Sequence, residues 1–141
     1  NLTGVFLCCQ KIGKVMVKQR KGVIINISST YGLVAPDQRI YGKSGQNSAA
    51  FYATTKSGIL NLTRYLASYW QRKGIRVNTL SPGGVEKNQD PDFIKKYSER
   101  TPLGRMAKKD EYIGPIIFLA SEASSYMTGS NLIVDGGWTA W

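Results

Sequence analysis

The sequence contains no histidine and only two cysteines, Cys8 and Cys9, which are adjacent. Adjacent cysteines do not form a normal disulfide, and neither has another cysteine elsewhere in the chain to pair with. With no histidine and no separated cysteines, we expect no metal site of the zinc type. Free thiols are typical of a reducing compartment, so we expect a cytoplasmic protein.

Acidic residues are scarce, and long apolar runs are absent. The chain has 9 Asp and Glu against 19 Lys and Arg, which gives a formal charge of +10. An excess of this kind can indicate a nucleic-acid partner, but here the basic residues are scattered rather than clustered, so we expect none. No apolar run approaches the ~18–20 residues of a membrane span, so we expect no membrane partner.

The start of the chain lacks an initiator Met and the basic and apolar regions of a signal peptide. This suggests that the start was trimmed or never cloned. The 141 residues are 42% hydrophobic, with 15 Gly and 5 Pro, which excludes a disordered or low-complexity chain. The composition indicates one globular domain or a part of one.

Apolar periodicity divides the chain into alternating helices and strands. We expect helices at 2–20, 49–72 and around Asp92–Ser98, and a last helix that Asp110 caps and that ends near Ser121. Strands are expected at 23–28, 75–80 and 131–135, and a long loop at 30–50. The alternation predicts the α/β class with a parallel sheet.

Two of these expectations concern burial. The first strand is a short run rich in β-branched residues, which is typical of a strand buried on both faces. In the last helix, the periodicity indicates a buried stripe made of Ile113, Ile116, Ile117 and Leu119.

Polar and turn-forming residues follow the first two strands. Ser28 and Ser29 end the first strand, and Pro82 and Gly83 follow the second. Because ligands of parallel α/β sheets bind outside the carboxyl ends of the strands, these residues mark a candidate site. The helix that connects the two strands carries Tyr52, so its side chains are expected near the same edge.

Tyr52 and Lys56 are four residues apart and would share one face of that helix. A phenol has an unperturbed pKa near ~10, and a neighbouring positive charge favours the phenolate. This pair could therefore act as a general acid and base near neutral pH. The Tyr-x-x-x-Lys spacing is a weak signal alone, and its value comes from the surrounding motifs.

Five segments occur in an order and spacing that are specific in combination: 1–6, 22–29, 52–56, 75–84 and 126–137. On these segments the chain resembles the carboxyl-terminal part of a short-chain dehydrogenase/reductase. The Tyr-Gly pairs within 31–42, the Gly-Gly-Val after Pro82 and the Asp-Gly-Gly-Trp end are similar to members found in bacterial sugar and surface-polysaccharide pathways.

The resemblance implies a Rossmann-like doubly wound parallel sheet that lacks its amino-terminal nucleotide-binding strands. Residues 1–141 would then be a single partial domain. The family's Gly-rich phosphate loop is absent, and no strand here is followed by a Gly cluster that opens a helix. The fragment alone would therefore bind its cofactor poorly, and its first strand would be an exposed edge.

The resemblance also implies a role for each matched residue. Tyr52 would exchange a proton with the substrate oxygen, and Lys56 would favour the phenolate and hold the nicotinamide ribose. Ser29 would hydrogen-bond the reacting oxygen. Asn1 would position a water beside the lysine. The segment Pro82, Gly83 and Val85 would contact the nicotinamide carboxamide.

The function so implied is oxidoreduction between a secondary alcohol and a ketone by hydride transfer with NAD or NADP. The small-molecule substrate would be polar or sugar-like, and the enzyme a homodimer or homotetramer. An alternative is a relative that has lost catalysis and serves as a binding or structural subunit.

Three residue assignments leave alternatives open. Ser28 could replace Ser29 as the strand-end serine, although the spacing from Asn1 favours Ser29. Tyr41 could compete with Tyr52, but Gly45 stands where the lysine would be required. Asn1 could instead serve only as a helix cap.

Overall fold

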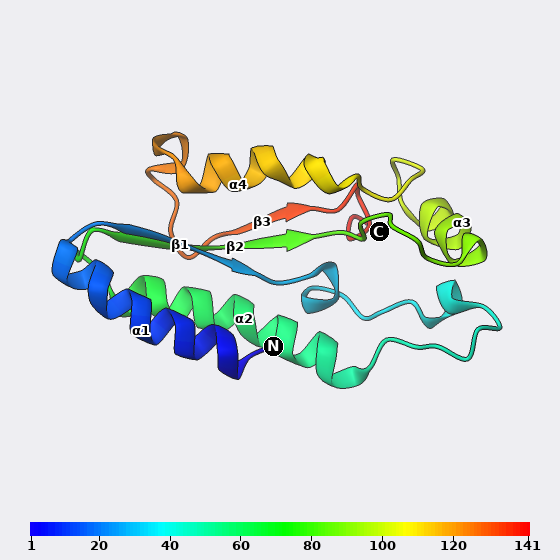
Figure 1. Cartoon of the computed structure of the whole chain (residues 1–141), viewed down its shortest axis with the longest axis horizontal. Coiled ribbons are helices and arrows are strands. Elements are labelled where there is room, and N and C mark those ends of the chain that lie inside the picture. The colour runs from blue at the N-terminus through cyan, green and yellow to red at the C-terminus, as the bar shows by residue number, and fades with distance from the viewer.

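The structure is a computed structural model that describes all 141 residues. Three parallel strands form one sheet in the order β1-β2-β3, with bounds β1 Gly22–Ile27, β2 Ile75–Pro82 and β3 Asn131–Val134. Two helices cover one face and a third covers the other, namely α1 Thr3–Gln19 and α2 Ala50–Tyr69 against α4 Ile113–Ala120 (Figure 1). The fold is therefore the doubly wound parallel α/β sheet that the sequence predicts, without further strands.

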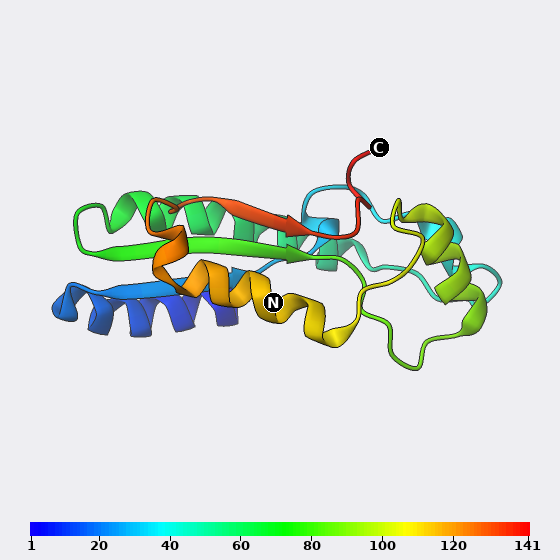
Figure 2. The ribbon, with the colours of Figure 1, turned by 90° about the horizontal axis from the view of Figure 1, so that it is seen from above.

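The segments after the strands lie together at one end of the sheet. Helix α3 Pro91–Arg100 and the long loop that contains the 3₁₀ turn Gln38–Tyr41 both extend beyond the carboxyl ends of β1 and β2 (Figure 2). The remaining short 3₁₀ turns are Thr30–Gly32, Lys109–Tyr112 and Glu122–Ser124. The arrangement leaves the candidate site at the edge that the parallel topology predicts.

The main core lies between the sheet and the pair α1 and α2. Cys9, Leu66, Trp70, Ile75 and Val77 form it, and Val77 is fully buried. The indole of Trp70 fills the space above Gly13, where a methyl group on the glycine Cα would collide with the ring carbons. A side chain at this glycine would separate α1 from α2, so the packing of the two helices depends on its absence.

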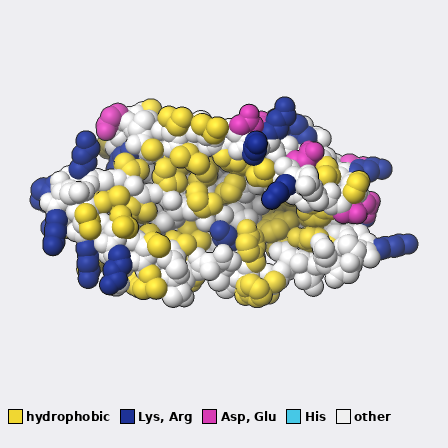
Figure 3. Space-filling model, viewed as in Figure 1, with side chains coloured by type: hydrophobic (Ala, Val, Ile, Leu, Met, Phe, Trp, Pro, Cys, Tyr) yellow, Lys and Arg dark blue, Asp and Glu magenta, His cyan; other side chains and the backbone are white.

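The prediction that β1 is buried on both faces is wrong. Ile27 is 43% exposed, and the preceding residues of the strand are mostly half-buried. β1 is an edge strand that pairs with β2 on one side only, so its outer side has no neighbour. Hydrophobic side chains accordingly spread over the face between α4 and α1 (Figure 3). This confirms the expectation that the first strand is an exposed edge.

The prediction for the last helix is also partly wrong. Only Leu119 is buried, whereas Ile113, Ile116 and Ile117 are between 42% and 60% exposed. Because this helix is apolar all round, its periodicity does not reveal which face lies on the sheet. Asp110 does not cap it, since the preceding 3₁₀ turn is held by the Glu111 carboxylate, which accepts the N–H of Lys108 at 2.7 Å.

None of the helices combines the length and the apolar character that a membrane crossing requires.

Candidate active site

The two serines at the end of β1 have different roles in the structure. The Ser28 hydroxyl is buried and donates to the Lys56 carbonyl at 2.7 Å, so it fastens the strand to helix α2. The Ser29 hydroxyl oxygen accepts the N–H of Tyr31 at 3.2 Å, which leaves its own O–H free to donate. Both line the same pocket, but only Ser29 keeps an uncommitted donor.

Gly32 allows this close approach of the loop to helix α2. A methyl group on its Cα would lie 2.6 Å from the Ser28 hydroxyl and 2.9 Å from the Lys56 carbonyl. Its φ is not positive, so the requirement here is for space and not for a left-handed backbone. Any side chain at this position would displace the loop from the helix.

Tyr52 and Lys56 lie on the same side of α2, as their spacing predicts. The Lys56 Nζ is 5.7 Å from the centroid of the Tyr52 ring, and it donates to the Ile27 carbonyl at 3.0 Å. Burial lowers the pKa of the Lys56 ammonium. The lysine is thus held between the tyrosine and the end of β1.

Strand β2 continues through Pro82, two residues further than the expected strand 75–80, and a tightly held turn follows. The Gly83 N–H donates to the Val134 carbonyl at 2.9 Å, and the Tyr112 hydroxyl donates to the Gly83 carbonyl at 3.1 Å. The Gly84 N–H donates to the Tyr97 hydroxyl at 2.6 Å. Burial raises the pKa of Tyr112 to about 12, so this phenol remains a donor at any physiological pH.

The Val85 N–H differs from the N–H groups of Gly83 and Gly84, because it has no hydrogen-bond acceptor in the chain. Its carbonyl, by contrast, accepts the Gln89 side-chain amide at 2.8 Å. Val85 lines the pocket, so its free donor is available to a bound group with a carbonyl oxygen.

These segments meet around one open pocket of about 540 Å³. Ser29, Tyr52, Pro82, Gly83 and Val85 all line it, which brings together five of the predicted site residues. We call it the strand-end pocket, because it lies beyond the carboxyl ends of β1 and β2.

Asn1 and Lys56 line a neighbouring groove that runs along the outer side of β1. The start of α1 lies against α2 near Lys56, because Leu2 packs on Gly58. A Cβ atom added to Gly58 would lie 3.2–3.4 Å from the two methyl carbons of Leu2. Leu2, and not Asn1, occupies the cap position of α1, and it makes no side-chain cap bond. Lys56 therefore connects the groove with the strand-end pocket.

An aromatic wall encloses the outer part of the strand-end pocket, and the sequence analysis did not assign it to the site. Tyr31, Tyr41, Phe93 and Tyr97 form the wall, and all four line the pocket. The ring centroids of Tyr41 and Phe93 are 5.4 Å apart, and those of Phe93 and Tyr97 are 5.9 Å apart. The interleaved tyrosines of the 30–50 loop were a signal for it, but their partners on α3 are distant in sequence.

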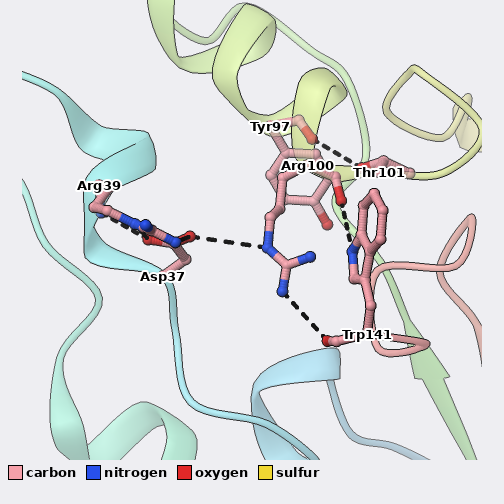
Figure 4. Close-up of polar contacts among 6 residues, drawn as sticks. All are labelled: Asp37, Arg39, Tyr97, Arg100, Thr101 and Trp141. Carbon is pink, nitrogen blue, oxygen red and sulfur yellow. Dashed lines mark hydrogen bonds and ion pairs between the residues drawn. The ribbon is translucent and has the colours of Figure 1, made fainter.

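A cluster of charged and aromatic side chains lies beside Tyr97 of this wall (Figure 4). The Asp37 carboxylate binds both Arg39, at 2.7 Å, and Arg100, at 3.8 Å. The Arg100 guanidinium lies 5.4 Å from the rings of both Trp138 and Trp141. We call these contacts the Asp37–Arg100 cluster. It joins the long loop, the end of α3 and the last residues of the chain.

Comparison with known proteins gives one consistent result. The family described as enoyl-(acyl carrier protein) reductase matches residues 1–139. A galactitol 2-dehydrogenase (L-tagatose-forming) from Cereibacter sphaeroides is 34% identical over 147 residues, which cover 100% of this chain and 55% of that protein.

Solved structures agree with this. A short-chain dehydrogenase from Leptospira borgpetersenii with bound NAD+ superposes with a TM-score of 0.92 at 46% identity, over 99% of this chain and 53% of that one. A gluconate 5-dehydrogenase from Burkholderia cenocepacia in complex with NADP and tartrate gives 0.88 at 37% identity, over 100% of this chain and 54% of that one.

The chain spans about half the length of the relatives that it matches. The match nevertheless runs through every segment that positions the strand-end pocket, from the amino end of α1 to the turn after β3. The chain therefore belongs to the short-chain dehydrogenase/reductase family.

Proposed function

We propose that residues 1–141 are a single partial domain, the catalytic carboxyl-terminal part of a longer NAD- or NADP-dependent oxidoreductase. Three observations support it: the chain spans about half of its relatives, β1 is an open edge, and a groove runs along that edge. Amino-terminal strands that continue the sheet beyond β1 would bind the nucleotide. We call this chain, joined to those strands, the complete protein.

The proposed reaction interconverts a secondary alcohol and a ketone on a polar, sugar-like substrate. The observation that carries it is the convergence of Ser29 and Tyr52 on one pocket, with Lys56 directly behind the tyrosine. Similarity to a galactitol dehydrogenase and a gluconate 5-dehydrogenase supports the substrate class.

In the oxidation direction, the substrate hydroxyl would lie within reach of both side chains. The Ser29 O–H would donate to the reacting oxygen and stabilise its negative charge. The Tyr52 phenolate would take the hydroxyl proton, and in reduction the phenol would return it to the carbonyl oxygen. Asn1 would hold a water beside Lys56, through which the proton reaches solvent.

The residues present fit a nicotinamide nucleotide. The free Val85 N–H suits the carboxamide oxygen, and Pro82 and Gly83 line the pocket beside it. A methyl group at Gly83 would lie 2.8 Å from the Cα of Asp135, so the close packing of this turn on the segment after β3 requires glycine. Lys56 would bind the ribose hydroxyls together with Tyr52. When bound, the nicotinamide supplies or accepts the hydride.

The test is the Tyr52→Phe substitution in the complete protein, assayed by NAD(P)H absorbance with a panel of sugar alcohols. Loss of the phenol removes the proton exchange, so we expect kcat to fall about 10²–10⁴-fold while nucleotide binding is kept. Tyr126→Phe, at a fully exposed position outside the pocket, is the matched control. Equal turnover in both variants would exclude Tyr52 as the proton-exchanging residue, and no turnover even in the unsubstituted protein would favour the alternative of a binding or structural subunit.

We also propose a homodimer or homotetramer in a reducing cytoplasm. Exposed apolar residues on neighbouring helices support the assembly: Phe6 and Leu7 on α1, and the stacked rings of Tyr65 and Tyr69 on α2. The free thiols of Cys8 and Cys9 support the compartment.

A further inference from the structure

The aromatic wall gives the strand-end pocket a chemical character of its own. Three of its members, Tyr31, Tyr41 and Tyr97, bring phenol hydroxyls from three separate segments: a 3₁₀ turn, the long loop and α3. Phe93 lies between Tyr41 and Tyr97. A ligand in this pocket therefore meets aromatic faces alternating with hydroxyl groups.

No charged side chain is among the eighteen residues that line the pocket. Three charged groups near the pocket have partners of their own. Asp37 is bound by Arg39 and Arg100, and the Lys56 Nζ lies in the neighbouring groove and donates to the Ile27 carbonyl. Asp92 pairs with Lys96 at 2.7 Å. The wall thus offers neither a cation for an anionic substrate nor an anion for a cationic one.

The phenols keep this wall uncharged. Burial raises the pKa of both Tyr31 and Tyr97, and the neighbouring Tyr41 phenol raises that of Tyr31 further. The Tyr97 hydroxyl already accepts the Gly84 N–H, so its own O–H remains to donate inward. The Gln89 side chain is held in one position, because its amide oxygen accepts the Lys87 N–H and its amide nitrogen donates to the Val85 carbonyl.

We propose that the strand-end pocket selects uncharged polyhydroxylated alcohols and ketoses over carboxylates of the same chain length. On binding, the substrate hydroxyls lose hydrogen bonds to water and form hydrogen bonds to the phenols instead, while the substrate C–H groups lie against the aromatic faces. A carboxylate would lose its hydration without gaining a cation, which is unfavourable. The inference rests on the proposed function and narrows it, because the relatives include enzymes for both substrate types.

The test compares galactitol with galactonate, and sorbitol with gluconate, as substrates of the complete protein with NAD+ and with NADP+. We expect kcat/KM for each alditol to exceed that for its aldonate about 100-fold, because the carboxylate stays unpaired. An aldonate used equally well, or better, overturns the inference and leaves the oxidoreductase function standing.

Calorimetric titration of the same ligands, with nicotinamide nucleotide present, measures the preference without turnover. Alditol binding without any oxidation would overturn the proposed function while the pocket's selectivity is kept. Tighter binding of the aldonate would overturn the inference whatever the turnover.

A variant pair then tests whether the missing cation in the strand-end pocket sets the selectivity. Asn47 is exposed and lines the pocket, so it tolerates a larger side chain without disturbing the core. Asn47→Arg should raise the aldonate-to-alditol ratio of kcat/KM at least tenfold, because it supplies the missing cation. Asn47→Gln is the neutral control and should leave the ratio unchanged. An unchanged ratio in the arginine variant would contradict the assignment.

Discussion

Thr63 joins the two strands beneath the site through a buried network of side-chain hydrogen bonds. Its hydroxyl accepts the Asn26 amide at 2.9 Å from β1 and the Thr79 hydroxyl at 2.8 Å from β2. Asn26 also accepts the Cys9 thiol at 3.3 Å, and burial raises the pKa of that thiol. A single residue on α2 thereby fixes the helix that carries Tyr52 against both strands.

Thr63→Val keeps the shape of this side chain and removes its hydroxyl. Because the Asn26 amide N–H and the Thr79 hydroxyl would then lack an acceptor at buried positions, we expect a loss of about 1–3 kcal/mol in the free energy of unfolding. Urea denaturation of the complete protein measures it. Thr54→Val, at an exposed position of the same helix, is the control and should change stability little. Identical midpoints for both variants would show that the network contributes nothing.

The sequence predicts the main site residues correctly as neighbours, but it does not separate their roles. Ser29, Tyr52 and Pro82 are placed at one edge by a general rule, since the ends of parallel strands coincide. The spacing from Asn1 already favours Ser29 over Ser28, and the bond from the Ser28 hydroxyl to the Lys56 carbonyl supplies the physical reason. The free Val85 N–H is likewise a property of the turn's hydrogen bonding, not of residue type.

At the scale of elements, the Asp37–Arg100 cluster holds the long loop against α3. The Arg39 side chain, which hydrogen-bonds the Asp37 carboxylate, lowers the pKa of Asp37 to about 2 from 3.8, and Arg100 contributes in the same direction. Because the folded-state pKa is lowered, the ion pair stabilises the closed loop fully above about pH 4. That stabilisation is lost as the pH falls through about 2. The contact that this cluster makes between the long loop and α3 should therefore stay unchanged between pH 5 and 8.

Asp37→Asn tests this coupling at neutral pH. Without the carboxylate the loop loses its charge pair with α3, and we expect KM for the alcohol substrate to rise roughly 3–5-fold with kcat nearly constant. Limited proteolysis within residues 33–49 should quicken as well. Glu99→Gln removes an exposed carboxylate on α3 and serves as the control. A fall in kcat with an unchanged KM would contradict a positioning role.

The elements also show where periodicity is insufficient. The strands and the long helices follow from alternating apolar runs, and their bounds are predicted to within a few residues. The aromatic wall could not be predicted, because the irregular loop that carries Tyr41 is brought against Phe93 of α3 only by tertiary packing. Burial of β1 and α4 was overestimated for a related reason: periodicity identifies an apolar surface, but not whether this chain covers it.

At the scale of the whole molecule, the open edge of β1 tests whether further strands complete the sheet. An unpaired strand with apolar side chains favours association with other chains. In the 141-residue chain alone, Ile27→Lys should reduce aggregation, because an edge lysine opposes strand-to-strand pairing. In the complete protein the same residue would be covered, and the buried ammonium should destabilise the fold by several kcal/mol.

Ile27→Lys is thus expected to reduce aggregation of the isolated chain but to destabilise the complete protein, so the two measurements together test the proposed continuation of the sheet. Light scattering of the isolated chain and thermal unfolding of the complete protein measure them. Ile133→Lys on β3, the other edge, is the matched control, because its side chain is 45% exposed and the proposal places no strand beside it. It should be tolerated in both forms. If Ile27→Lys leaves the complete protein as stable as the control does, β1 remains an edge there, and the proposed continuation of the sheet is wrong.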